Sequence, residues 1–88
     1  MTLREAILDS LVDDGETIKQ INEYLIYLGI LTTERSIIEI LNKLLEEEKI
    51  IIVFPENINL ESLLDCEYIS DLWFELTQKG YEEWETIR

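Results

Sequence analysis

Apolar residues in the first third of the chain recur every three or four positions, which is the spacing of amphipathic helices. The pattern predicts a first helix over residues 3–12, followed by Gly15 as a left-handed cap. A second helix is predicted to begin at Thr17, because Thr17 and Gln20 have the spacing of a capping box, and to end at Gly29. Both helices are expected to bury one apolar stripe in a shared core.

A third helix is predicted after Thr32 or Thr33, since either side chain can cap it. Glu34 then lies in the first turn, where a negative charge interacts favourably with the helix dipole. The residues predicted on its buried face are Ile37, Ile40, Leu41, Leu44 and Glu48, with Ile38 and Leu45 at the edge of that face.

The stretch IIIVF at residues 50–54 predicts a strand, because it is rich in β-branched residues. Pro55 ends this strand, since proline cannot donate a hydrogen bond to a neighbouring strand. Residues 56–71 are irregular. Within them, Asn59 is predicted to cap a single helical turn containing Leu60, Leu63 and Leu64.

The end of the chain predicts a second strand and a closing helix. Apolar and polar side chains alternate along residues 71–77, which is the pattern of a half-buried strand. The two alternating sets are Leu72, Phe74 and Leu76 on one face and Trp73 and Glu75 on the other. Gly80 is predicted to break this pattern, and a short amphipathic helix is predicted over residues 81–87.

This order of elements resembles that of the winged helix-turn-helix proteins, and three stretches carry the resemblance. They are TIKQINEYL, similar to the first helix of the helix-turn-helix; TTERSIIEILNKLLEEEKIII, similar to the recognition helix and the strand after it; and WFELTQKGYEEW, similar to the second wing strand and the last helix of MarR-like and PadR-like regulators. The resemblance covers nearly the whole chain. It implies a single, mostly helical α+β domain over residues 1–88, with a three-helix bundle, a two-stranded wing and a C-terminal helix.

The resemblance also implies a DNA-binding function. The protein would then be a homodimeric transcription regulator whose third helix reads the edges of the bases. Base contacts need Arg, Lys, Asn, Gln or similar side chains on the exposed face of that helix. The residues that could make them are Arg35, Ser36, Asn42 and Lys43, with Arg4 and Lys19 as further basic residues. The last helix is where winged helices commonly dimerise, which assigns Tyr81, Trp84 and Ile87 to a dimer interface. Packing of these residues on the first helix of the same chain is the alternative.

The charge of the chain opposes DNA binding. It has 20 acidic and 7 basic residues, a formal net charge of −13. Affinity for nucleic acid comes mainly from Lys and Arg that displace counterions from phosphates, so this charge disfavours it. The same charge favours a basic partner.

The distribution of charge leads to the same conclusion. On the third helix the pairs Arg35–Glu39, Glu39–Lys43 and Lys43–Glu47 have a four-residue spacing, so the bases are expected to be neutralised within the helix. Residues 55–71, the expected wing, contain no Lys or Arg. The acidic residues there are Glu56, Glu61, Asp65, Glu67 and Asp71. Such a wing would be repelled by a phosphate backbone, whose contacts set the position of a DNA-binding protein.

The sequence therefore predicts a small acidic protein-interaction module that binds or neutralises a basic protein, in the manner of an immunity protein, an antitoxin or an inhibitor. Apolar residues surrounded by acids suit such an interface. The residues predicted to form it are Ile38, Leu45, Trp73, Glu39 and Glu46. The DNA-binding regulator remains the alternative.

No catalytic, cofactor or metal site is predicted. The chain has no His, one Cys (Cys66) and three isolated glycines, so it lacks a zinc site, a catalytic triad and a phosphate-binding loop. It also has no apolar run of membrane-spanning length, and the early acidic residues do not fit a signal peptide, so a cytoplasmic protein is expected.

Overall fold

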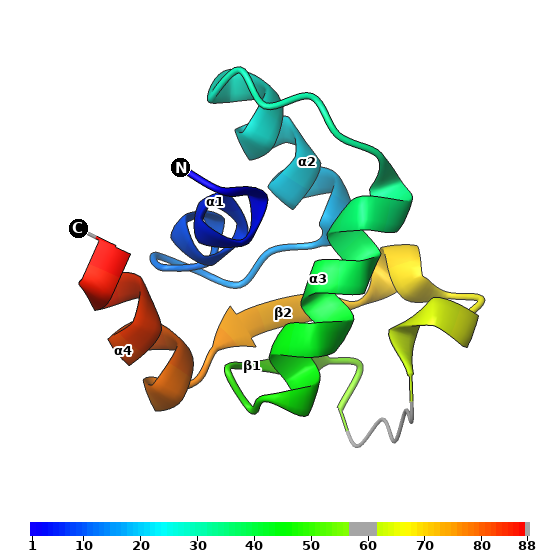
Figure 1. Cartoon of the computed structure of the whole chain (residues 1–88). Helices are drawn as coiled ribbons and strands as arrows, with labels where there is room; N and C mark the ends of the chain where they lie inside the picture. Colours follow the sequence, from blue (N-terminus) through cyan, green and yellow to red (C-terminus); the bar gives the residue numbers. More distant parts are fainter. Residues whose placement is uncertain (57–61, 88) are drawn as a thin grey trace.

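Three helices precede a two-stranded antiparallel sheet, and a fourth helix follows it (Figure 1). The computed structural model describes residues 1–56 and 62–87. In chain order the elements are α1 (Leu3–Ser10), α2 (Ile18–Tyr27), α3 (Glu34–Glu46), β1 (Ile50–Phe54), the short 3₁₀ turns η1 (Leu63–Asp65) and η2 (Ile69–Asp71), β2 (Trp73–Leu76) and α4 (Gln78–Ile87). The predicted order of elements and the α+β class are confirmed.

The helices and the inner face of the sheet enclose one hydrophobic core. Its buried side chains are Ala6, Ile7, Leu8, Leu11, Ile18, Ile21, Leu25, Ile37, Leu41, Leu44, Ile50, Leu63, Leu72 and Phe74. The core thus takes side chains from α1, α2, α3 and both strands, and η1 adds Leu63. In Figure 1, α4 lies beside α1, and both chain ends lie on the same side of the view.

Local capping follows the sequence closely. The Thr17 hydroxyl accepts a hydrogen bond from the backbone N–H of Gln20, and the side-chain oxygen of Gln20 accepts one from the backbone N–H of Thr17, so the predicted capping box is confirmed. Thr33 caps α3 by accepting from the backbone of Ser36. Gly29 follows α2 with a φ of 82°, as predicted for a glycine that ends a helix.

Gly15 is not the left-handed cap that was predicted. α1 ends at Ser10, and Leu11 caps it in a right-handed conformation. The segment after it instead runs along β2, where the backbone of Glu16 exchanges two hydrogen bonds with Phe74 (3.0 and 2.9 Å). A side chain at Gly15 would meet the Glu75 side chain at 3.1 Å. Gly15 therefore permits a close approach to β2, which the sequence did not indicate.

The two strands pair in one register with an irregularity. Ile51 lies opposite Glu75, and Phe54 lies opposite Trp73, with Val53 as an extra residue between the paired positions. The predicted alternation of β2 is confirmed: Leu72 and Phe74 are fully buried and Trp73 and Glu75 are exposed, while Leu76 is half-buried against the core. The outer face of the sheet is therefore formed by side chains from both strands.

Two predictions near the ends of α3 and β2 are wrong. Glu48 was placed on the buried face of the third helix, but α3 ends at Glu46 and Glu48 is exposed with a φ of 60°. Gly80 was predicted to lie before the last helix, but it lies inside α4. A Cβ at Gly80 would come within 2.0 Å of the Lys49 carbonyl oxygen, so this glycine lets α4 pack against the end of the α3–β1 turn.

The irregular segment contains one predicted feature. Leu63 and Leu64 do lie in a short helical turn, η1, but its cap is Ser62, which accepts a hydrogen bond from the Leu64 backbone. Asn59 and Leu60, the other residues of that prediction, lie outside the described residues.

Candidate protein interface

Two of the α3 residues that were predicted to read DNA, Arg35 and Asn42, have partners within the chain. Arg35 forms an ion pair with Glu39 (3.2 Å), as the four-residue spacing predicted. Asn42 donates to Glu46 (3.2 Å) and accepts a hydrogen bond from the backbone of Leu63 in η1 (2.9 Å). Asn42 therefore holds the β1–β2 connection against α3, a role that differs from the predicted base contact.

Of the remaining predicted DNA-binding residues, Ser36 is hydrogen-bonded and the two lysines, Lys19 and Lys43, are exposed. The Ser36 hydroxyl accepts from the Thr33 hydroxyl (3.0 Å) near the start of α3. Glu39 and Glu47, the predicted partners of Lys43, are paired with Arg35 and Arg4, respectively, and none of the described ion pairs includes Lys43. The predicted Glu39–Lys43 and Lys43–Glu47 pairs are therefore not formed. Lys43 lies exposed on α3, and Lys19 lies exposed on α2.

Arg4 belongs to an ion-pair network between α1, α4 and the end of α3. Its guanidinium donates to Glu83 (2.7 and 2.8 Å) and to Glu47 (2.6 Å), and Lys49 also donates to Glu83 (2.7 Å). The hydrogen bond from Arg4 is the main reason that the pKa of Glu83 falls to about 2, and the pKa of Arg4 is raised in turn. The positive charge of Arg4 is therefore paired with Glu83 and Glu47 within the chain.

The structure does not assemble the predicted partner-binding set as one exposed patch. Ile38 and Leu45 are half-buried and pack against the core, so their apolar surface is largely covered. Glu39 and Glu46 are exposed on α3 and make the hydrogen bonds described above. Only Trp73 of the predicted apolar residues is exposed, and it lies on the outer face of β2.

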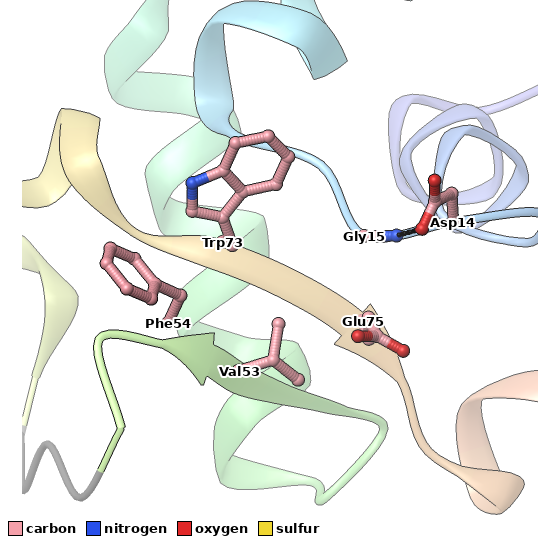
Figure 2. Close-up of a pocket in the computed structure, with 6 residues that line it drawn as sticks. All are labelled: Asp14, Gly15, Val53, Phe54, Trp73 and Glu75. Atoms are coloured by element: carbon pink, nitrogen blue, oxygen red, sulfur yellow. Dashed lines mark hydrogen bonds between the residues drawn. The ribbon is translucent and has the colours of Figure 1, made fainter.

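Trp73 is joined there by apolar residues of β1. The exposed fraction is 49% for Ile51, 58% for Phe54 and 36% for Trp73, and Val53 is half-buried among them. Figure 2 shows the rings of Trp73 and Phe54 projecting from neighbouring strands, with Glu75 further along β2. We call these four apolar residues, Ile51, Val53, Phe54 and Trp73, the outer-face patch.

A hollow of about 350 Å³ opens beside the outer-face patch. Its walls are Val53, Phe54 and Trp73 from the sheet and Asp14 and Gly15 from the α1–α2 connection, together with Glu75. The carboxylates of Asp14 and Glu75 stand on the side of the hollow away from the Phe54 ring (Figure 2). Such a hollow can accept an apolar side chain whose neighbours carry positive charge, because apolar burial and charge attraction then act together.

The β1 residues of the outer-face patch were missed in the sequence. The run IIIVF is apolar at every position, so it lacks the alternation that tells an outward side chain from an inward one. The alternation of polar and apolar residues along β2 could have revealed them. Trp73 and Glu75 lie on its outer face, so the strand that pairs with β2 must also place side chains on that face.

The residues assigned to a dimer interface pack largely within the chain. The indole of Trp84 donates to Asp9 of α1 (2.9 Å), and Ile87 packs against the core. Tyr81 remains 39% exposed, with its ring centroid 5.2 Å from that of Trp84. Packing on the first helix, the alternative for this set, is what the structure shows for Trp84.

The part of the chain that the structure describes holds no helix long and apolar enough to cross a membrane. Over the same residues, no group of His, Cys, Asp and Glu side chains is arranged to hold a metal ion. Cys66 is a half-buried free thiol.

Comparisons of the chain with protein-family models, with curated proteins and with solved structures produced no match.

Proposed function

We propose that this chain is a winged helix that serves as a protein-interaction module and contacts a basic partner through the outer face of its sheet. The observation that carries the proposal is the outer-face patch, with its hollow between apolar rings and the carboxylates of Asp14 and Glu75. Exposed aromatic residues beside a concave surface are typical anchors of protein interfaces.

The arrangement of elements supports the winged-helix assignment. Three helices lead into an antiparallel strand pair, a long connection joins the strands, and a last helix packs beside α1. The bridge between Glu16 and Phe74 places a third backbone segment beside β2, on the side away from β1. The connection between the strands is the wing of this proposal, and α3 occupies the place of the recognition helix.

The side-chain contacts favour a protein partner over DNA. Arg4 of α1 and Arg35 of α3 are paired with acids, and Asn42 of α3 accepts a hydrogen bond from η1, so these three predicted DNA-binding side chains already have partners within the chain. The described part of the wing carries exposed acids at Glu56, Glu67 and Asp71. A phosphate backbone would be repelled by both surfaces.

A binding experiment with DNA tests the first half of the proposal. Fluorescence anisotropy with a labelled random duplex, and with the duplex upstream of the coding region, should show no binding at a salt concentration of about 50 mM. Binding that weakens steeply as salt rises would show that phosphates are contacted, and the homodimeric regulator would replace the proposed function.

Selection from a random peptide display library tests the second half. The peptides retained should combine an apolar or aromatic residue with neighbouring Lys or Arg. Their binding should be lost with Phe54→Ser and retained with Tyr27→Ser, which removes an exposed ring on α2. Peptides that bind both variants equally would place the interface elsewhere.

A further inference from the structure

A second cavity, of about 420 Å³, lies among α1, α2 and α4. It is bounded by Asp13 and Glu16 of the α1–α2 connection, whereas Asp14 and Gly15, between them in sequence, bound the hollow of the outer-face patch. The same short connection therefore separates the two cavities. We call the second one the aromatic cavity, after the rings of Tyr24, Tyr81 and Trp84 that line it.

Asp9 holds two of these rings in place. Its Oδ1 accepts a hydrogen bond from the Trp84 indole (2.9 Å), and its Oδ2 accepts one from the Tyr24 hydroxyl. The second bond, with burial, raises the pKa of Tyr24 to about 12. Tyr81 adds a third ring, tilted by 58° to that of Trp84. The aromatic walls are thus built from three helices and positioned by one carboxylate.

Asp13 and Glu16 add negative charge to the same walls. The described residues that line the cavity include no Lys or Arg, and none of the described ion pairs involves Asp13 or Glu16. Burial, together with the nearby carboxylates of Asp14 and Glu23, raises the pKa of Glu16. Among the described residues, the carboxylates of Asp13 and Glu16 therefore have no cation paired with them.

We propose that the aromatic cavity binds an alkylammonium or guanidinium group, the charged anchor of the basic partner. Aromatic faces attract such cations, carboxylates balance their charge, and the cavity has the size of small-ligand sites. The proposal deepens the proposed function and rests on it for the source of the group: a Lys or Arg near the apolar residue that enters the hollow. A free polyamine carries the same chemistry.

The binding is measured on the whole chain by ¹H–¹⁵N NMR, with the indole resonance of Trp84 as the reporter. The ligands are a short peptide containing Lys, the same peptide with acetylated Lys, and spermidine, all at constant ionic strength. The Lys peptide should shift the Trp84 indole resonance saturably, and the acetylated peptide should not. Equal shifts from both peptides would overturn the proposal, because acetylation removes the charge.

Single charge-removing variants distinguish binding in the cavity from non-specific attraction to an acidic protein. Glu16→Gln and Asp13→Asn should each weaken binding of the Lys peptide roughly two- to fivefold, the size typical of a partly exposed charge pair. Glu82→Gln, on the exposed side of α4, removes the same charge and should leave the affinity unchanged. An equal loss with Glu82→Gln would mean attraction by net charge alone and would overturn the proposal.

Two further results distinguish the sources and the two proposals. Spermidine that binds more tightly than the peptide would support the cation site and assign it to free amines. Phe54→Ser should leave Lys-peptide binding at Trp84 intact, because Phe54 lines the other cavity. Display peptides that depend on Phe54 but are indifferent to Glu16→Gln would refute the cation site and leave the proposed function standing.

Discussion

The guanidinium of Arg4 donates two hydrogen bonds to the carboxylate of Glu83, from Nε to Oε2 at 2.7 Å and from Nη2 to Oε1 at 2.8 Å. This bidentate pair joins the first helix to the last, 79 residues along the chain. Both side chains are about three-quarters covered, so solvent screens the pair less than a surface ion pair. Arg4, which was predicted as a basic residue that could contact DNA, instead joins α1 to α4.

Glu83→Gln should lower the free energy of unfolding by about 1–2 kcal/mol, because Arg4 and Lys49 both lose the charge of their shared partner. Urea unfolding followed by circular dichroism measures this. Glu82→Gln is the matched control, since Glu82 is exposed on the same helix. Equal stability of the two variants would contradict the role given to the network.

The stabilisation by Glu83 should depend on pH. Its pKa falls from the ordinary 4.5 to about 2 in the folded chain, so its contribution is fully present above about pH 4.5 and is lost as the pH falls toward 2. The difference in unfolding free energy between the wild type and Glu83→Gln should therefore shrink over this range. Urea unfolding at several acidic pH values tests it, and a constant difference would count against the depressed pKa.

Asn42→Leu should destabilise the chain by about 1–2 kcal/mol, because the backbone N–H of Leu63 loses its acceptor on α3. Asn42→Asp keeps an acceptor oxygen and should cost less. Chemical denaturation compares the two, and hydrogen exchange at Leu63 reports the bond directly. Protection of Leu63 that is unchanged in Asn42→Leu would show that Asn42 does not hold η1.

Gly80→Ala should destabilise the chain by about 1–3 kcal/mol, although alanine is the better helix former, because the new Cβ would lie 2.0 Å from the Lys49 carbonyl oxygen. Gly29→Ala is the comparison. Its Cβ would meet nothing within 4 Å, and its cost of about 1 kcal/mol arises from the positive φ alone. Thermal unfolding ranks the two, and the reverse order would argue against close packing at Gly80.

Glu48→Gly should stabilise the chain by about 0.5 kcal/mol, because Glu48 has the left-handed conformation (φ 60°) in which glycine is favoured after a helix. The exposed ion pair with Lys79, at 3.7 Å, is lost but contributes little. Glu48→Ala removes the same ion pair but keeps a Cβ at this positive φ, so it should not stabilise the chain. Thermal melting of both variants tests the assignment.

Several features that depend only on neighbours in sequence were predicted correctly, although the cap at Gly15 and the two ion pairs of Lys43 were not. The capping box of Thr17 and Gln20 and the glycine after α2 require only residues within one turn, and the burial of Leu72 and Phe74 follows from the two-residue period of a strand. The Arg35–Glu39 pair has the same local origin. For these features, the identity and spacing of the residues are enough to predict the interaction.

The roles of Asn42, Gly80 and Phe54 were decided by the tertiary structure, because each depends on a segment remote in sequence. Asn42 meets η1, Gly80 meets the carbonyl of Lys49, and Phe54 faces solvent since β2 pairs with β1 in one particular register. The sequence by itself determined the elements, the core stripes and the acidic charge. The packing of those elements decided which polar groups are paired within the chain and which apolar side chains remain exposed. The physical reason is that burial depends on the neighbours that pack around a residue, and these neighbours are remote in sequence.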